Sequence, residues 1–504
     1  MAAESSTLKA SLQSIEAVRH QDKATRQDDG FLYQKLLFDC PMTYETTPGG
    51  KDTAWLEMSA ELLYGRKGDD VQKILFTEKN VKDLLRTKKI LVFLCGGPMD
   101  KNEANRNPTM NELLLDKGYW ILFPDYRGTG QSKTYRDVPM GKPSRDNRIV
   151  PQQIGNKWYK KLRQTDIVRD LESVRRCLLG DKKWETLGQS FGGWVSLTYL
   201  SFHPQGLEKV RIAGGLAPFD NARDVYKSLF RLVIERNDDY YLKYTGDVQT
   251  VRKVVRWLAK KDMNRDSVVL PKGNLPEAGL LTAQRFLCMG RMLGARGTWE
   301  KIHDTLAAME SDIENDDTGN QLTDETLALY KHNDSWRIDD RPGYAVMHEA
   351  MYCVQDGSRS NWAAHDIAQK FSRQYWWVNC DLKQISAELE KRDGKLYFSG
   401  EMVYKFFFDT YGGLMDKELK EEAFALAEYK WPEKMYDDGQ LSKNTVPVNA
   451  VSYKEDMHVD PVLSEQARKK FGNGSMNHEL VGEGLEHAAL RTHTNKVIDL
   501  LWRT

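Results

Sequence analysis

The sequence has no excess of charge of either sign and no long hydrophobic run. Its 504 residues include 73 Lys and Arg and 73 Asp and Glu, so the formal net charge is +0. Nucleic acids and anionic membranes attract a basic excess, so this balance argues against both as partners. No apolar run approaches the roughly 18 residues that a membrane-spanning helix requires. With 40% hydrophobic and 29% charged residues, the chain is expected to be soluble and globular, with a large core.

Cysteine is also scarce, and the six cysteines lie far apart with no C-x-x-C pair. This spacing argues against a disulfide framework or a zinc site, and it favours free thiols in a reducing compartment. Residues 1–30 lack the apolar segment of a signal peptide, and they carry acidic residues that transit peptides avoid. We therefore expect a cytoplasmic protein, and we expect residues 1–30 to form a helix or a mobile arm.

The first 219 residues alternate between patterns typical of strands and of helices. Strands are predicted at residues 55–64, 89–95, 119–123, 184–187 and 210–216. Helices are predicted at residues 165–179 and 194–202. Strands separated by helices indicate the α/β class, with a doubly wound, mostly parallel sheet.

After residue 219 the pattern becomes helical, charged and rich in aromatic residues, and it stays so to residue 444. An acidic run at 311–324 is expected to be a surface loop. A strand pattern returns at 446–453, and a helical run closes the chain at 495–503. We therefore predict three segments. Residues 1–219 and 445–504 form one α/β core, and residues 220–444 form a helical cap domain inserted before its last strands.

The strongest chemical signal is the hexapeptide GQSFGG at residues 188–193, which lies between a predicted strand and a predicted helix. A G-x-S-x-G sequence at such a turn is typical of the nucleophile elbow of α/β hydrolases. The strained turn favours glycine on both sides of the serine and exposes the hydroxyl above the sheet. Ser190 is therefore the candidate nucleophile.

A serine hydroxyl needs a base to become a nucleophile, and the base needs a carboxylate to orient it. In this fold the chain order is serine, then acid, then histidine. The acids after the strand at 446–453 are Glu455, Asp456 and Asp460. The preferred base is His487, just before the final helix, and the alternatives are His493 and His478.

Backbone N–H groups are expected to form an oxyanion hole on the loop after the strand at 89–95. That loop reads CGGP, and two glycines allow close approach to a substrate carbonyl. We assign the donors to Gly97, or Gly96 beside it, and to Phe191. In the segment 124–132, Asp125 and Arg127 are expected to brace loops rather than to take part in the chemistry.

These motifs together resemble the prolyl aminopeptidases, or proline iminopeptidases, which are serine peptidases of the α/β-hydrolase fold. That family shows H-G-G-P-G, then D-x-R-G-x-G-x-S, then G-x-S-x-G-G, and this chain has CGGPM, DYRGTGQS and GQSFGG. The resemblance continues in GGLAPFDNARDVY, HEAMYC, SNWAAH, YFSGEMVYKFFF and YKEDMHVD. The chain departs from the family at Cys95, Met99 and Phe191, where members carry His, Gly and commonly Trp.

The resemblance implies a serine exopeptidase that releases an N-terminal residue, preferably proline, from short peptides through an acyl-enzyme. Ser190 and His487 match its nucleophile and base, and Asp456 matches its acid, with Asp460 as the alternative. No metal or cofactor is implied. The sequence leaves open whether the chain forms a homo-oligomer.

An exopeptidase of this kind must recognise a free α-ammonium group, and a buried carboxylate does so through charge-assisted hydrogen bonds. Glu349 matches a family position with that role, and Glu401 is a second candidate. A proline ring needs an apolar slot, for which Trp362, Tyr352 and Phe191 are candidates. Two other functions stay open: an esterase or amidase acting on a non-peptide substrate, and a non-catalytic binding protein.

Overall fold

The computed structural model describes residues 11–18, 29–41, 43–44, 55–78, 80–132, 158–272, 275, 278–315, 321–334, 336–339, 341–472, 474–482 and 484–503. The chain divides into two compact units. Unit 1 comprises Met1–Phe219, Lys434–Lys454 and Pro461–Thr504, and unit 2 comprises Asp220–Glu433 and Glu455–Asp460.

These boundaries differ from the expected insertion at residues 220–444. Helix α16 (Asp438–Ser442) packs on helix α4 (Phe191–Phe202), and the ring centroids of Tyr436 and Phe219 lie 4.6 Å apart. Residues 434–444 therefore belong to unit 1. Residues 455–460 belong to unit 2, although they follow a strand of unit 1 directly.

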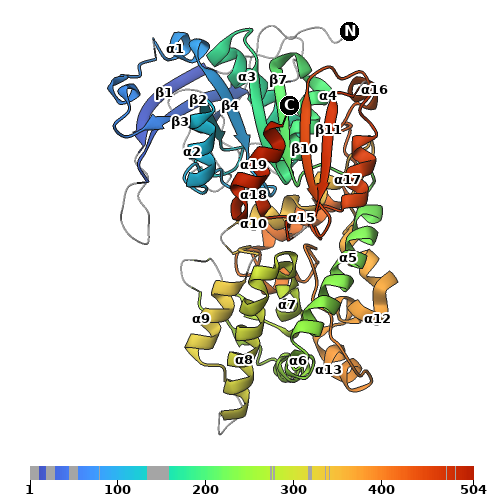
Figure 1. Ribbon diagram of the computed structural model, residues 1–504. Coiled ribbons are helices and arrows are strands. Elements are labelled where there is room, and N and C mark those ends of the chain that lie inside the picture. Colours follow the sequence, from blue (N-terminus) through green and yellow to red (C-terminus); the bar gives the residue numbers. More distant parts are fainter. Residues whose placement is uncertain are drawn as a thin grey trace. The chain divides into compact units, whose positions relative to one another are not determined.

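Within the described residues, unit 1 contains a nine-stranded sheet in the order β1-β2-β3-β5-β4-β6-β7-β10-β11 (Figure 1). Its strands are β1 (Ser11–Val18), β2 (Phe31–Pro41), β3 (Trp55–Arg66), β4 (Lys89–Leu94), β5 (Tyr119–Pro124), β6 (Trp184–Gln189), β7 (Leu207–Ala213), β10 (Val448–Tyr453) and β11 (Met476–Val481). The pairs β1–β2, β2–β3 and β3–β5 are antiparallel, and all the others are parallel. The sheet is therefore mostly parallel, as the sequence predicts.

Helices cover the strands of unit 1, as expected for strands with apolar residues on both faces. They are α1 (Val81–Thr87), α2 (Pro108–Asp116), α3 (Gln164–Leu179), α4, α16, α17 (Pro461–Arg468), α18 (Ala489–Thr492) and α19 (Thr494–Trp502). Helices α2 and α19 pack on each other, and α3 packs on α4. The core between the sheet and the pair α2 and α19 includes Leu91, Leu187, Val451, Met110 and Ile498, all at most 2% exposed.

The predictions for the ends of the sheet are partly wrong. Residues 11–18 form strand β1, not a helix, because they pair along β2 as an antiparallel ribbon. Strands β2 and β11 are not predicted from the sequence. Strand β11 is the last strand of the sheet, with only Met476 buried, so it lacks the apolar run that marks the inner strands.

Unit 2 is mainly helical. Its described helices are α5 (Ala222–Lys243), α6 (Asp247–Met263), α7 (Ala283–Leu287), α8 (Trp299–Asn315), α9 (Asp324–Asn333), α10 (Pro342–Met347), α11 (Ala363–Ala368), α12 (Ser372–Tyr375), α13 (Leu382–Glu390), α14 (Phe407–Thr410) and α15 (Lys417–Glu428). Strands β8 (Val268–Val269) and β9 (Leu280–Leu281) form a small antiparallel pair. Residues 311–315 of the expected acidic loop continue helix α8, and residues 316–320 lie outside the described residues. Of the helices described in either unit, none has the length and apolar character required to span a bilayer.

Candidate active site

Ser190 lies at the turn from strand β6 to helix α4 in unit 1. Its backbone has φ 54° and ψ −122°, a conformation that a residue with a side chain rarely adopts. Hydrogen bonds on both sides hold this strained turn. The Ser190 N–H donates to the Ala213 carbonyl at 3.1 Å, and the Gly193 N–H donates to the Ser190 carbonyl at 2.8 Å. The turn therefore has the geometry expected of a nucleophile elbow.

The glycines after Ser190 are required because other backbone lies against them. A Cβ atom on Gly192 would lie 1.9 Å from the Leu94 carbonyl oxygen, and one on Gly193 would lie 2.2 Å from the Gly215 carbonyl oxygen. Neither oxygen belongs to a flexible side chain that could move away. The beginning of helix α4 therefore packs directly against the end of strand β4 and the loop after β7.

His487 brings the candidate base to the candidate nucleophile. Its Nε2 atom lies 2.9 Å from Ser190 Oγ, although the two residues are 297 positions apart in the chain. His487 belongs to the segment between strand β11 and helix α18. A hydrogen bond between these atoms is the contact that lets a histidine accept the serine proton during attack on a carbonyl.

The alternative histidines lie elsewhere. His478 is on strand β11 with its Nδ1 atom 3.3 Å from a Glu465 carboxylate oxygen, and burial lowers its pKa. His493 lies at the end of helix α18, where its Nδ1 atom is 3.0 Å from the Thr492 hydroxyl. Of the three candidate bases, the structure brings His487 to the serine.

The candidate acids belong to the segment 455–460 of unit 2. Asp456 is 1% exposed, and its Oδ1 atom accepts the N–H groups of His458 at 2.8 Å and Val459 at 3.0 Å. Asp460 is also buried and accepts a hydrogen bond from the Ser228 hydroxyl within the same unit. The role of Asp456 as the triad acid stays a prediction.

The predicted oxyanion loop lies against the elbow. A Cβ atom on Gly96 would be 3.0 Å from Ser190 Cβ, so no larger side chain fits there without displacement. The Tyr126 hydroxyl donates to the Cys95 carbonyl oxygen at 3.2 Å and fixes the start of the loop. Gly97 has φ 70°, and helix α4 begins at Phe191. The two predicted backbone donors thus belong to segments that border Ser190, and their role as the oxyanion hole stays a prediction.

The two departures from the family motif on this loop have physical consequences. Cys95 is buried, burial raises the pKa of its thiol well above the usual value, and its Sγ atom lies 3.7 Å from the Asp100 carbonyl oxygen. A neutral, buried thiol is a poor nucleophile. Met99 has φ 64°, the left-handed region that favours glycine, at the motif position where the family carries glycine.

Asp125 and Arg127 hold the loops around the elbow, but each through a different partner. Asp125 accepts the Asn102 N–H at 2.8 Å and the Gln131 N–H at 2.7 Å, and burial raises its pKa to about 6. Arg127 is fully buried and donates two hydrogen bonds of 2.7 Å to the carboxylate of Asp170 on helix α3. The expected bracing therefore runs through backbone amides and an aspartate of helix α3.

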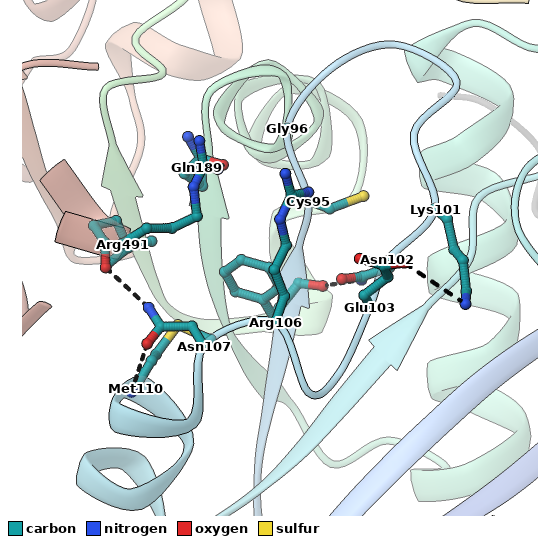
Figure 2. Close-up of a pocket in the computed structure, with 12 residues that line it drawn as sticks. Cys95, Gly96, Lys101, Asn102, Glu103, Arg106, Asn107, Met110, Gln189 and Arg491 are labelled. Atoms are coloured by element: carbon teal, nitrogen blue, oxygen red, sulfur yellow. Dashed lines mark hydrogen bonds and ion pairs between the residues drawn. The ribbon is translucent and has the colours of Figure 1, made fainter. Parts of the chain in front are cut away.

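Unit 1 also contains a pocket that the sequence analysis did not identify (Figure 2). About 420 Å³ of space lies among its lining residues, and part of this space is open solvent. Its lining residues are Phe93, Cys95, Gly96, Lys101, Asn102, Glu103, Arg106, Asn107, Met110, Gln189, Leu490 and Arg491. Gln189 immediately precedes Ser190, and Arg491 lies one helical turn after His487. This closeness in the chain to the predicted nucleophile and base is the only sign of the pocket in the sequence.

Glu349, in unit 2, is a buried carboxylate that serves as a helix cap. It is 5% exposed, and its two oxygens accept the N–H groups of Ala363 at 3.0 Å and Ala364 at 2.9 Å, at the start of helix α11. The side chain of Trp362, the residue before this helix, makes no capping bond. Burial raises the pKa of Glu349 to about 7 despite these hydrogen bonds. Among the described residues Glu349 forms no ion pair with a cation.

Glu401, the second carboxylate candidate, already has cationic and polar neighbours within unit 2. It accepts a hydrogen bond of 2.9 Å from Arg291 and one of 2.5 Å from the Tyr344 hydroxyl, and it lies 3.4 Å from His458 Nδ1. Burial opposes its ionisation, but Arg291 and His458 together outweigh burial and hold the pKa of Glu401 well below its usual value. Glu401 is therefore ionised and paired.

The candidate proline-slot residues of unit 2 are both buried among aromatic rings. Trp362 is 7% exposed, and its ring centroid lies 5.6 Å from that of Phe408. Tyr352 is 2% exposed, and its ring centroid lies 5.4 Å from that of Tyr226. Asn361 and Trp362 have φ values of 50° and 56°, so two consecutive residues with side chains are strained just before helix α11.

Across the described residues, no group of three or more His, Cys, Asp or Glu side chains has an arrangement that could hold a metal ion.

Comparisons with known proteins show which sequences and structures the chain is similar to. The α/β-hydrolase fold profile matches residues 89–244. The chain is 30% identical over 418 residues to the proline iminopeptidase aneH of Aspergillus aculeatus, covering 82% of this chain and 84% of that protein. It is 29% identical over 417 residues to the proline iminopeptidase of Aeromonas sobria, covering 82% and 86%. The solved proline iminopeptidase of Mycobacterium smegmatis aligns over 91% of this chain and 96% of its own, with 13% identity and a TM-score of 0.37.

The family resemblance seen in the motifs thus extends over most of the chain, and the aligned region includes far more than the elbow. The chain belongs to the proline iminopeptidase family and has the α/β-hydrolase fold.

Proposed function

We propose that this protein is a serine aminopeptidase that releases N-terminal proline from short peptides. The observation that supports this most directly is the 2.9 Å contact between Ser190 Oγ and His487 Nε2 at a strained strand-to-helix turn. The relatives named proline iminopeptidases supply the substrate class.

In the proposed reaction, Ser190 Oγ attacks the carbonyl carbon of the N-terminal residue while His487 Nε2 accepts the hydroxyl proton. The N–H groups of Gly97 and Phe191 stabilise the oxyanion, and Asp456 orients the imidazole. His487 then gives its proton to the leaving amine as the C–N bond breaks. Water, activated by the same histidine, hydrolyses the acyl-enzyme and restores Ser190.

We propose Glu349 as the carboxylate that recognises the substrate α-ammonium group. Glu401 is already paired with Arg291, whereas Glu349 has no cationic partner among the described residues, so an ammonium ion would supply the missing charge. A buried carboxylate binds an ammonium ion through strong charge-assisted hydrogen bonds. Trp362 and Tyr352 are proposed to contact the proline ring, together with Phe191.

We further propose that the protein acts in the cytoplasm. All six cysteines are free in the structure, which suits a reducing compartment.

The test compares hydrolysis of prolyl, alanyl and leucyl arylamides with that of N-acetyl-prolyl arylamide. We expect the free-amine prolyl substrate to be cleaved fastest and the acetylated one at least about 100-fold more slowly, since acetylation removes the charge that Glu349 recognises. Rapid cleavage of the acetylated substrate, or of simple esters alone, would contradict the aminopeptidase function and favour an esterase or amidase.

A further inference from the structure

The pocket of unit 1 combines an apolar floor with a charged rim. Its floor is formed by the partly buried side chain of Phe93, which packs on the core residues Met110 and Leu490 beneath it. The rim carries Lys101, Arg106 and Arg491, which Figure 2 shows among the residues that line the pocket. Such a pocket suits a small ligand with an apolar body and a negative charge.

Among the described residues that line the pocket, Glu103 is the only acidic one, and it has a neighbouring cation. Lys101 Nζ lies 3.9 Å from a Glu103 carboxylate oxygen, so these two charges largely offset each other. The other charged side chains that line the pocket are the guanidinium groups of Arg106 and Arg491. Guanidinium groups present forked N–H donors that match the two oxygens of a carboxylate.

The pocket lining includes chain neighbours of the reacting groups, although Ser190 and His487 themselves do not line it. Gln189 immediately precedes Ser190, and its Oε1 atom lies 3.4 Å from Arg491 Nη1. A Cβ atom on Gly96 would lie 3.0 Å from Ser190 Cβ, which shows how closely this wall approaches the serine. Leu490 and Arg491 follow His487 within about one helical turn. This part of the pocket lining therefore belongs to the segment that carries the base, and not to the oxyanion loop.

The chemistry of acyl transfer places the leaving group on this side. The amine that departs when the C–N bond breaks receives its proton from His487 Nε2, so the residue after the scissile bond must lie next to the histidine. A pocket that begins at Gln189 and continues along the segment after His487 is positioned to hold that residue.

We propose that this pocket binds the residue that follows the scissile bond, with an apolar side chain on the floor and its free α-carboxylate at Arg106 and Arg491. The preferred substrates are then dipeptides of proline followed by an apolar residue, because only in a dipeptide does that residue carry the free carboxylate. This specificity rests on the proposed aminopeptidase function.

The test compares kcat/KM for the dipeptide Pro-Leu with that for its amide, Pro-Leu-NH2, which lacks the negative charge. We expect the wild type to prefer the free carboxylate by about tenfold or more, the effect of one charge-assisted hydrogen bond at a solvent-exposed site. The double variant Arg106→Gln with Arg491→Gln should bring this ratio close to one, and Arg106→Glu should favour the amide. Lys496→Ala, which removes an exposed cation on helix α19 outside the pocket, should keep the wild-type ratio.

Equal or faster cleavage of the amide by the wild type would overturn the pocket assignment, and so would a ratio that survives the double variant. If the variants do not fold, inhibition of the wild type decides: free leucine should compete with Pro-Leu about tenfold better than leucinamide, and equal inhibition by the two would overturn the proposal. Cleavage of prolyl arylamide distinguishes a failure of the aminopeptidase function from a failure of the pocket assignment. If it is not cleaved, the aminopeptidase function itself fails. If it is cleaved while the dipeptide and its amide react alike, only the pocket assignment fails.

Discussion

The two units hold their key side chains in different ways. In unit 1 the reactive serine is held by backbone: Gly192 and Gly193 lie against carbonyl oxygens, and amide hydrogen bonds fix the turn. In unit 2 the buried carboxylates of Glu349 and Glu401 are held by a helix end and by side-chain partners. Backbone packing does not titrate, whereas a buried carboxylate does. The geometry around Ser190 should therefore depend on side-chain volume, and the geometry around Glu349 should depend on pH.

The largest expected effect is on catalysis in unit 1. Ser190→Ala should lower kcat/KM for prolyl arylamide by roughly 10⁴-fold or more, because the nucleophile is lost, while the melting temperature stays nearly unchanged. Ser196→Ala is the matched control, since Ser196 lies on the same helix and its hydroxyl donates to the Gly192 carbonyl at 2.9 Å. Activity of Ser190→Ala above a tenth of wild type would show that another residue is the nucleophile.

The second prediction compares crowded with open glycines. Gly192→Ala should lower the free energy of unfolding by about 3 kcal/mol or more, since its Cβ would lie 1.9 Å from a backbone oxygen. Gly246→Ala, in unit 2, meets no atom within 4 Å and has φ −66°, so it should be neutral or slightly stabilising. Chemical denaturation measures both. Equal effects of the two substitutions would show that the backbone contacts at Gly192 do not restrict side-chain volume there.

The third prediction tests the dependence of unit 2 on pH. Burial raises the pKa of Glu349 from 4.5 to about 7, so between these values the folded state binds more protons than the unfolded state. Stability contributed by this group is therefore present at low pH and lost as pH rises toward 7, by about 3 kcal/mol in total. Glu349→Gln should abolish this part of the pH dependence.

The measurement is the difference in unfolding free energy between wild type and Glu349→Gln from pH 4 to pH 8. Other titrating groups, such as Asp125 in unit 1, occur in both proteins and cancel in the difference. A difference that does not change with pH would show that Glu349 has the same pKa in the folded and unfolded states.

The smallest expected effect concerns backbone strain in each unit. Met99 in unit 1 and Asn361 in unit 2 have φ values of 64° and 50°. Met99→Gly should raise the free energy of unfolding by up to about 1 kcal/mol, since glycine removes the strain but adds freedom to the unfolded chain. Asn361→Gly should gain less, because asparagine tolerates this conformation better than methionine does. Thermal melts of both variants test this order, and a larger gain at Asn361 would reverse it.

Much of unit 1 could be predicted from the sequence because its inner strands are short apolar runs. Strands β4, β5, β6 and β10 follow those runs closely. The outer strands β1 and β11 were missed, since an edge strand is stabilised by pairing with its neighbour and not by an apolar sequence of its own. Strand β2 has alternating buried residues, Leu36, Phe38 and Cys40, and this pattern is typical of a strand.

The site, too, could be predicted from the sequence only in part. Ser190 and His487 could be identified because a strained elbow requires glycines and because chain order fixes the base. The capping of helix α11 by Glu349 could not be predicted, because it depends on hydrogen bonds between residues 14 or more positions apart in the chain. The pocket around Gln189 and Arg491 joins residues still further apart, and their alignment is set only by the folded sheet.

The most direct test of the account is labelling by a proline-derived diphenyl phosphonate with a free amine, followed by mass spectrometry of the digested protein. We expect one adduct, on the peptide that contains Ser190, formed much more slowly in His487→Ala and with the N-acetylated reagent. An adduct on another residue, or equal labelling of the His487→Ala variant, would contradict the assignment of Ser190 and His487 as nucleophile and base.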